Sequence, residues 1–507
     1  MKDSKSVTEL ILKSIESWKT WQLVLLLGVV AAVVYAASFG NGWTLDDFPV
    51  IVDNPDVTGL RAFWEDSYPG RPLREVTYLL DYALFGLDPV GYHVQNIFWH
   101  ALAGSLLFLV VCQLGSSRRA ALAAALLFLV HPLGVEVVAN TSHRKDSLAL
   151  VFMLLAWWGL EEFRRREKGY LFLGLAGVSL GLGLLAKQNA AAWPLFVVGY
   201  FFWGGRWYGA QTIGRRVAIT LAASVAAISG YLVLLSVRQD LFFSKAIPVL
   251  SKMNTTLAAG DISTYLTMVL KSLAFMAVKI VWPLSLAVEY VFSPPQGWFA
   301  PWTMAGILIL ASCLMMLMVG GKNRVLLWGG GWILTMWLPV SNLWPWSYFA
   351  ADRYMYAPLA GVAVVAAFAW ERYVPRRMAC DLAGIGMLAV LAGLTVHQVG
   401  VWKSPATLWA QAYEVSPTST TVLNNMGSVA MQANDLELAR FYYERANQNM
   451  NTPLTYYNLG TVYERLGNTE QAMRNYQYFM MFNDPKYADV AQKLRLRLLR
   501  RQLGTSP

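Results

Sequence analysis

Long apolar runs, each ended by arginine or lysine, constrain the fold of this chain more than any other sequence feature. A helix needs about 20 predominantly apolar residues to cross the ~30 Å hydrocarbon core of a bilayer, and the sequence contains twelve apolar runs close to this length. Hydrophobic residues make up 56% of the 507 residues and charged residues only 14%, against about 25% charged in soluble domains. We therefore predict a multi-span membrane protein and exclude a simple water-soluble enzyme.

Basic loops between the runs set the predicted number of crossings. The runs fall at 21–38, 95–113, 119–137, 146–163, 169–186, 190–204, 217–236, 264–286, 301–319, 325–340, 354–371 and 382–399. Basic loops mark the cytoplasmic side, and two cytoplasmic loops are separated by an even number of crossings. Three runs lie between Arg216 and Lys322, so one of them does not cross. The run at 264–286 carries Lys271 and Lys279, and we predict that it lies on or dips into the outer surface.

About eleven spans remain, with the N-terminus in the cytoplasm and the segment after Val399 outside. Residues 1–20 are predicted to form a cytoplasmic interfacial helix because apolar residues recur there at helical spacing. Residues 21–400 form the predicted transmembrane domain, and its first outward loop covers 39–94. Residues 401–507 form a polar C-terminal domain.

A repeat defines this polar tail. The segments NNMGSVAMQANDLELARFYYERA and YNLGTVYERLGNTEQAMRNYQYF align with an offset of 33, which pairs Gly427 with Gly460 and Tyr443 with Tyr476. This offset is close to the ~34-residue tetratricopeptide period. Such repeats usually present a concave peptide-binding surface, and a structural cap is the alternative. The final stretch KLRLRLLRR fits a helix on lipid head groups or a solvated end, and we favour the solvated end.

Charge and cysteine content exclude several other classes. The formal net charge of +10 lies largely in short loops between apolar runs, where it orients the spans, so we expect no nucleic-acid partner. Cys112, Cys313 and Cys380 are scattered and suggest neither a disulfide framework nor a thiolate metal site.

Asp46 and Asp47, in the segment WTLDDFPVIVDNPDV, are the sharpest local signal for chemistry. They follow the first span by a few residues, where a carboxylate meets both a lipid-borne donor and a water-borne acceptor. One acid of such a pair, partly desolvated, suits a general base for an acceptor hydroxyl. The alternative is that the pair caps a loop helix or forms ion pairs with Arg71 or Arg74.

Other ionisable residues gather at the outer ends of the spans. Ionisable groups at membrane depth usually line a site or a pathway, and cations there suit a lipid phosphate. Some of them could instead be interfacial anchors. The candidate phosphate ligands are Arg71, Arg74, Arg144, Lys187 and Arg353. The other site candidates are His93, His131, Glu136, His143, Asp146 and Asp352. No tight metal-ligand spacing or P-loop is present, so we predict no metal, with a divalent ion as the alternative.

Five segments, in order, resemble the transmembrane-and-tetratricopeptide O-mannosyltransferase family of the GT-C superfamily of membrane glycosyltransferases. They are LDDFPVIVDNPDV, RPLREVTYLLDYALFGLDPVGYHVQNIFWH, HPLGVEVVANTSHRKD, LLAKQNA and SNLWPWSYFAADRYMYAPLAG. The resemblance implies a GT-C fold, an all-α polytopic membrane helix bundle, and assigns the catalytic region to Asp46 and Asp47. Its other matched positions are Arg144, Asp146, Lys187, Asp352 and Arg353. Gln188 stands where relatives carry an acid.

The resemblance also implies inverting transfer of a sugar from a polyprenyl-phosphate carrier to a Ser or Thr hydroxyl of a protein on the outer face. Asp47 is the preferred base, and the five cations are expected to hold the departing phosphate. The lipid-linked sugar is the donor, the acceptor protein is expected to bind the tail, and no cofactor is required. The expected location is a bacterial inner membrane facing the periplasm, with the endoplasmic reticulum lumen as the alternative. Alternative functions are transfer to a lipid or polysaccharide, transport or flipping of a lipid, and non-catalytic scaffolding.

Overall fold

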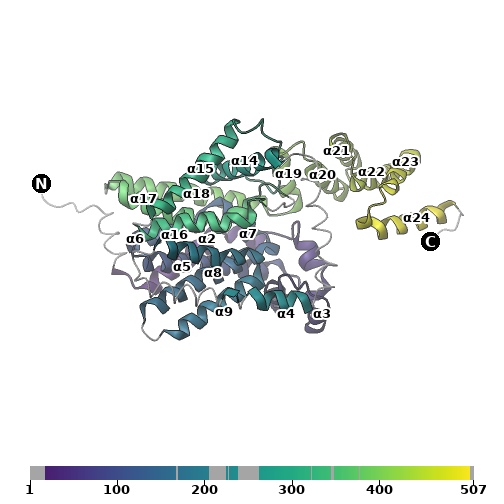
Figure 1. Ribbon diagram of the computed structural model, residues 1–507. Coiled ribbons are helices and arrows are strands. Elements are labelled where there is room, and N and C mark those ends of the chain that lie inside the picture. Colours follow the sequence, from purple (N-terminus) through teal and green to yellow (C-terminus); the bar gives the residue numbers. More distant parts are fainter. Residues whose placement is uncertain are drawn as a thin grey trace. The chain divides into compact units, whose positions relative to one another are not determined.

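The fold is entirely helical in the part of the chain that the structure, a computed structural model, describes (Figure 1). The described residues are 17–166, 169–204, 224–225, 228–237, 262–320, 323–343, 348–375 and 377–502. The predicted all-α class is therefore confirmed. Most of the predicted interfacial helix at 1–20 and much of the run at 217–236 lie outside these residues. The chain divides into two compact units, Met1–Leu286 with Ser293–Ser404, and Ala287–Phe292 with Pro405–Pro507.

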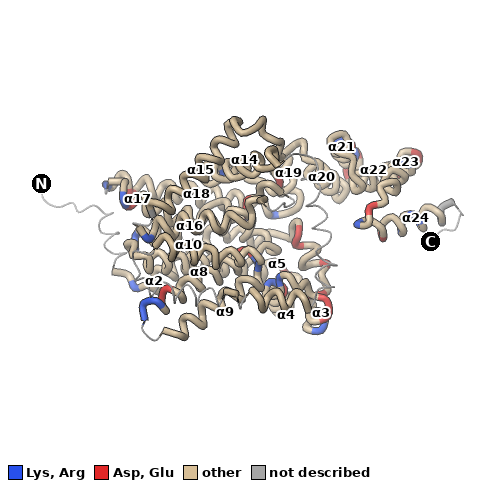
Figure 2. Tube along the Cα trace, in the orientation of Figure 1, with Lys and Arg blue, Asp and Glu red and all other residues tan. Residues whose placement is uncertain are grey.

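Long apolar helices make up most of the first unit. They are α2 (Thr20–Val34), α5 (Pro89–Gln113), α6 (Arg118–Val130), α8 (Arg144–Arg165), α9 (Tyr170–Ala186), α10 (Trp193–Trp203), α14 (Ile262–Val281), α15 (Pro301–Gly320), α16 (Arg324–Trp337), α17 (Tyr356–Tyr373) and α18 (Met378–Val401). Within this unit, charged residues concentrate at the ends of the helix bundle and are scarce along its middle (Figure 2). A bilayer imposes this distribution because charge inside hydrocarbon is costly.

Five helices among the described residues are long and apolar enough to span a membrane by themselves. They are α5, α14, α15, α17 with its preceding turn, and α18. A sixth span results if α6 continues through Pro132–Ala139 across a bend of 56°. The chain is thus a multi-pass membrane protein, and the total of eleven spans stays a prediction. The α14 helix meets the spanning criterion, and its predicted place on the outer surface also stays a prediction.

Close helix contacts and stacked aromatic rings hold the bundle together. A Cβ atom on Gly159 of α8 would lie 2.9 Å from the carbonyl oxygen of Phe172 in α9, so only glycine permits this approach. On α16, Trp328 stacks on Trp332 with ring centroids 4.7 Å apart. The ring of Trp157 in α8 packs edge-on 6.3 Å from that of Trp328. Close-packed interiors of this kind hold the helix ends, and the loops they carry, in fixed positions.

Short helices connect the long ones and carry most of the candidate site residues. They are η1 (Ala36–Gly40), η2 (Phe48–Val52), η3 (Pro55–Val57), α3 (Leu60–Asp66), α4 (Pro72–Phe85), η4 (Pro132–Gly134), α7 (Val135–Ala139), η5 (Thr141–His143), η6 (Gln188–Ala192), η8 (Leu338–Val340) and η9 (Asp352–Met355). Several begin at a side-chain cap. Asn140, for example, accepts a hydrogen bond from the Ser142 amide at 3.0 Å and starts η5.

The second unit contains two helix pairs flanked by one helix on each side in sequence. Its elements are α19 (Pro405–Val415), α20 (Thr420–Gln432), α21 (Leu436–Asn449), α22 (Pro453–Arg465), α23 (Thr469–Met481), η10 (Pro485–Tyr487) and α24 (Ala488–Gln502). The side chains of Ser419, Asp435, Thr452 and Asn468 cap the four helices from α20 to α23. Each cap accepts a backbone N–H that would otherwise lack a partner.

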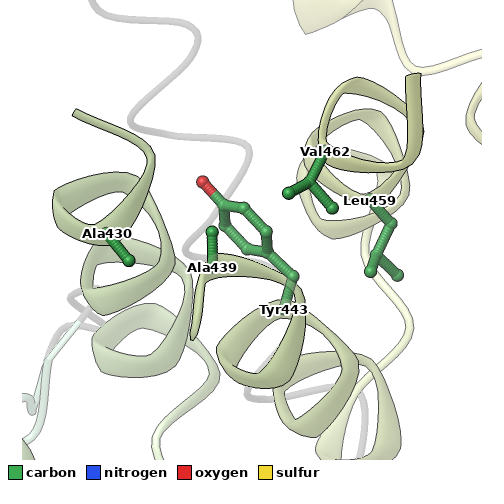
Figure 3. Close-up of a cluster of buried hydrophobic side chains, with 5 residues drawn as sticks. All are labelled: Ala430, Ala439, Tyr443, Leu459 and Val462. Atoms are coloured by element: carbon green, nitrogen blue, oxygen red, sulfur yellow. The ribbon is translucent and has the colours of Figure 1, made fainter. Parts of the chain in front are cut away.

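The same glycine–tyrosine contact recurs in both helix pairs. A Cβ on Gly427 would lie 2.5 Å from the ring of Tyr443, and a Cβ on Gly460 would lie 2.4 Å from the ring of Tyr476. The predicted repeat positions are therefore equivalent packing positions. The Tyr443 ring belongs to a buried cluster that joins α20, α21 and α22 (Figure 3). Its other members are Ala430, Ala439, Leu459 and Val462.

Candidate active site

The two adjacent acids after the first span differ completely in exposure. Asp46 is exposed, whereas Asp47 has no exposed surface. Leu45 precedes them with a φ of 49°, a left-handed conformation that costs a residue with a Cβ about 1–2 kcal/mol. Strained backbone of this kind often occurs at functional sites. The turn therefore presents one carboxylate to solvent and buries the next.

Asp47 connects the loop that follows α2 to the loop that follows α6. Its Oδ1 accepts hydrogen bonds from the Thr141 hydroxyl at 2.7 Å and from the Ser142 amide at 2.8 Å. Its Oδ2 accepts one from the Thr44 amide at 3.0 Å. Burial raises the pKa of Asp47 to about 6, although these hydrogen bonds oppose the rise. Both oxygens are thus occupied in holding two loops together.

Arg144 makes a fully buried ion pair with Asp81 of α4 at 2.5 Å. Its guanidinium also donates to the Asn96 side-chain oxygen at 2.7 Å and lies 4.9 Å from the centroid of the Tyr78 ring. The Tyr78 hydroxyl in turn donates to the carbonyl oxygen of Thr141 at 2.7 Å. Burial raises the pKa of Asp81, and the positive charge of Arg144 opposes that rise. Arg144 therefore fixes the loop between α6 and α8 to α4 and α5.

Two further ion pairs lie at the ends of other helices. Lys187, after α9, pairs with Asp146. Arg353, in η9, pairs with Glu136, and the Arg353 amide also donates to that carboxylate at 2.8 Å. Asp146, Lys187 and Arg353 line one pocket together with the ring of Tyr354. Residues far apart in sequence thus meet in one pocket.

His143 lies among positive charges beside this pocket. Its Nδ1 is 2.9 Å from the Nζ of Lys145. Burial lowers the pKa of His143 well below its ordinary value. The neighbouring charges that lower it further are those of Lys145, Arg353, Lys187 and Arg71. The imidazole is therefore neutral at physiological pH and adds no further positive charge.

Arg71, one of the cations near His143, has spare hydrogen-bonding capacity. It lies half-buried at the N-cap of α4, and its Nε has no hydrogen-bond partner among the described residues. Burial and the charge of Arg74 both lower its pKa. Arg74, by contrast, pairs with Glu75. Asp46 is within electrostatic range of Lys145, so the exposed acid and the cations belong to one region. Crowded, poorly hydrated cations of this kind favour a bound anion.

Only Asp146, Lys187 and Arg353 of the predicted site residues line the pocket, and His131, His93 and Asp352 are among those that do not. The Nε2 of His131, at the start of η4, hydrogen-bonds the carbonyl oxygen of Ile280 at 2.9 Å. His93 is fully buried on α5. Asp352 is buried next to Arg353 and is within electrostatic range of Lys279. No group of three or more His, Cys, Asp or Glu residues in the described part of the chain is placed to hold a metal.

Sequence reasoning missed several residues that organise this region. They are Tyr78, Asp81, Asn96, Thr141 and Ser142. Tyr78 and Thr141 are 63 residues apart, so no local spacing reveals their contact. The sequence shows Lys145 as a basic residue next to Arg144, but only the fold shows that its ammonium group contacts the His143 ring.

The fold and the site together define a class: a helical multi-pass membrane protein with a cation-lined pocket, an adjacent exposed carboxylate and a tetratricopeptide tail. Comparison with known families agrees. The profile of the family described as "Dolichyl-phosphate-mannose-protein mannosyltransferase" matches residues 77–233. The profile described as "Tetratricopeptide repeat" matches residues 420–448 and 454–477.

The chain is similar over most of its length to animal protein O-mannosyl-transferases. It is 24% identical to TMTC3 of Mus musculus over 511 residues, which cover 90% of this chain and 54% of the relative. It is 26% identical to TMTC4 of Homo sapiens over 488 residues, covering 82% and 65%. Identity with Tmtc1 of Drosophila melanogaster reaches 34% over 186 residues, covering 34% and 21%. The predicted resemblance to the transmembrane-and-tetratricopeptide O-mannosyltransferases is confirmed. The chain spans about half the length of the mouse relative.

Two solved structures show a more distant likeness. The oligosaccharyltransferase of Archaeoglobus fulgidus in the apo form has a TM-score of 0.47 at 12% identity, covering 78% of this chain and 57% of the other. ArnT from Cupriavidus metallidurans bound to undecaprenyl phosphate has a TM-score of 0.43 at 17% identity, covering 86% and 77%.

Proposed function

We propose that this chain is an inverting glycosyltransferase that moves a sugar from a polyprenyl-phosphate carrier to a Ser or Thr hydroxyl of a protein. The observation that carries the proposal is the convergence of Arg71, Lys187 and Arg353 close to an exposed carboxylate at the span ends. Cations suit the phosphate of the carrier, and the carboxylate suits the acceptor hydroxyl. Because the relatives are named mannosyl-transferases, mannose is the first sugar to test.

In this proposal Asp46 is the general base, in place of Asp47, which the sequence analysis preferred, and Asp47 positions Asp46. Asp46 is exposed to an incoming hydroxyl, whereas Asp47 is buried and accepts three hydrogen bonds. Asp46 takes the proton of the acceptor hydroxyl while its oxygen attacks the anomeric carbon. The bond from that carbon to the phosphate oxygen breaks, and polyprenyl phosphate leaves with both electrons. Attack opposite the leaving group inverts the anomeric configuration.

The cations hold the leaving phosphate. Arg71 has an unused guanidinium N–H, and Lys187 and Arg353 line the pocket. Asp146 and Glu136 keep Lys187 and Arg353 charged and oriented in the absence of donor. Charge that develops on the phosphate oxygens during transfer then meets donors that are already in position, which lowers the barrier.

The test of the base is transfer from a polyprenyl-phosphate mannose to an acceptor protein by the full chain in lipid nanodiscs. Asp46→Asn should lower kcat about 10²–10⁴-fold, the range for loss of a general base, and leave the melting temperature unchanged. The matched control is Asp53→Asn, an exposed acid in the same loop, which should retain full activity. Full activity in Asp46→Asn would reject the assigned base.

The test of the phosphate site is the donor concentration dependence of the same reaction. Arg71→Ala should raise KM for the donor and lower kcat, because the leaving phosphate loses a ligand. Arg61→Ala is the control, since Arg61 is an exposed arginine of the same loop that pairs only with Glu65 in the described contacts. If no variant at Asp46, Asp47 or Arg71 changes transfer, the enzyme proposal fails and a scaffold role replaces it.

We further infer that the site faces away from the cytoplasm, towards the periplasm of a bacterial cell or the lumen of the endoplasmic reticulum. Cysteine introduced at exposed Asp53 should react in intact cells or sealed vesicles with a membrane-impermeant maleimide applied from the outer or lumenal side. Cysteine at exposed Arg166, in a predicted cytoplasmic loop, should react only after permeabilisation. The opposite pattern would refute the assigned sidedness.

The tail is proposed to bind the acceptor protein. Its helix pairs match the tetratricopeptide profile, and stacked repeats of this type commonly present peptide-binding surfaces. Deletion of residues 405–507 should therefore raise KM for a protein acceptor much more than for a short Ser/Thr peptide. An equal effect on both acceptors would argue for a structural cap.

A further inference from the structure

The last helix of the tail differs in charge from the rest of the tail. Residues 405–487 carry five basic and seven acidic residues, whereas α24 carries five basic residues and one acid, Asp489. The basic character is therefore concentrated in one helix.

One face of α24 packs into the tail. Leu494 and Leu498 are buried with Tyr476 and Phe479 of α23. Arg497 adds hydrogen bonds at 3.0 Å to the Tyr476 hydroxyl and to the Glu464 carboxylate. These contacts fix the rotation of the helix, so its other side is defined as well.

The outward face of α24 carries two leucines between two cations. Leu496 and Leu499 are 50% and 52% exposed, and at 100° per residue they lie on the side opposite Leu494 and Leu498. Exposed Arg495 and Lys493 flank this pair on either side. No packing within the described tail accounts for these leucines.

We propose that this outward face of α24 binds the surface of an anionic phospholipid bilayer. Leucines flanked by snorkelling cations are the pattern by which interfacial helices lie at a membrane surface. A lysine or arginine near an anionic surface strengthens binding about fivefold. The tail starts at Pro405, shortly after the end of the candidate span α18 at Val401. Because the tail is covalently joined to this span, binding of α24 to the same bilayer is intramolecular, so weak binding is enough.

The charge pattern selects a lipid surface over an acidic protein segment as the partner. An acidic peptide would need cations along the binding face, but here the centre of that face is apolar and the cations are at its edges. This arrangement matches a bilayer, whose head groups lie above its acyl chains. The proposal replaces the solvated end that we favoured from the sequence with the lipid-bound alternative.

The test uses spin labels on the full chain in nanodiscs of phosphatidylcholine with and without phosphatidylglycerol. The native cysteines are replaced by alanine, and a label is placed by Leu496→Cys. The matched control is Leu438→Cys, a leucine that is 41% exposed on α21 of the same tail. With phosphatidylglycerol, the label at 496 should gain collisions with oxygen and lose collisions with a water-soluble nickel chelate. The label at 438 should not change.

Two perturbations should reverse the effect. Lys493→Gln with Arg495→Gln should lower the ratio of docked to free helix about 25-fold, from about fivefold per cation. Salt at about 1 M, where the Debye length falls to about 3 Å, should act in the same direction. Equal nickel accessibility at 496 in both lipids overturns the proposal, as does a change of the same size at 438. Shielding at 496 that requires the acceptor protein but not phosphatidylglycerol also overturns it, in favour of a protein partner. None of these results depends on transfer activity.

Discussion

Removing one partner of the buried Arg144–Asp81 ion pair should destabilise the membrane unit strongly. Neither side chain has any exposed surface, so Arg144→Met leaves a buried carboxylate without its counter-charge. Breaking a buried pair on one side costs about 3–5 kcal/mol. The change also removes the donor to Asn96, and an unsatisfied buried acceptor adds about 1–3 kcal/mol. For a unit of this size we expect the apparent Tm to fall by roughly 5–15 °C.

The double variant Asp81→Leu with Arg144→Met tests whether Arg144 holds its loop in position or binds the donor phosphate. It removes both charges and replaces them with apolar groups, so it should recover about 1–3 kcal/mol relative to the two single losses combined. The stability of each variant is measured by thermal unfolding in detergent, monitored through loss of the monodisperse peak. Arg61→Met is the control, because its pair with Glu65 is exposed and such pairs contribute at most about 1 kcal/mol.

The interpretation fails if Arg144→Met abolishes transfer while its Tm stays within a degree or two of the parent. That result would mean that Arg144 binds the donor phosphate directly, as the sequence suggested. Arg144→Lys provides a second check, because it keeps the charge but loses the planar fork of donors. It should show an intermediate fall in Tm.

Three further predictions concern separate features. Burial raises the pKa of Asp47 from 3.8 to about 6, so Asp47 favours folding while it is protonated. Its contribution to the free energy of unfolding, about 3 kcal/mol, is complete below pH 3.8 and is lost by about pH 6. Asp47→Asn should flatten that part of the Tm–pH profile, and an unchanged profile would contradict the assignment. Gly460→Ala should destabilise the tail by about 1–3 kcal/mol through overpacking against Tyr476, measured by circular dichroism of the chain during heating; no loss would refute the close contact. Glu136→Gln should raise KM for the donor, because Arg353 loses its charged partner, whereas an unchanged KM would separate Arg353 from the phosphate.

The repeat in the tail could be predicted from sequence because its key contacts are local. Gly427 and Tyr443 are on consecutive helices, and Gly460 and Tyr476 repeat the relation. Each tyrosine ring lies two turns into the next helix and leaves room only for glycine at the position it contacts. The glycine and the tyrosine therefore recur at the same spacing in both repeats. The concentration of charge at the ends of the spans was predictable for a different reason, since the bilayer excludes charge from the middle of every span.

The partners within the site were not predictable. Arg144 and Lys187 are both basic residues close to the end of a predicted span. In the structure, Arg144 is enclosed by Asp81 and Asn96, whereas Lys187 lines a pocket. The difference depends on where α4 lies, which no local pattern encodes. Likewise, the order of exposure in Asp46 and Asp47 depends on the left-handed turn at Leu45. Leucine carries no signal for that conformation, in contrast to glycine or asparagine.

The link from Asp47 to Thr141 has a consequence for the order in which the protein matures. These residues are 94 positions apart, and α5 and α6 lie between them. During synthesis, Asp47 is made well before Thr141. The turn that carries Asp46 and Asp47 therefore stays unpaired until α5 and α6 have been made, so the contacts around the candidate site form only late in biogenesis.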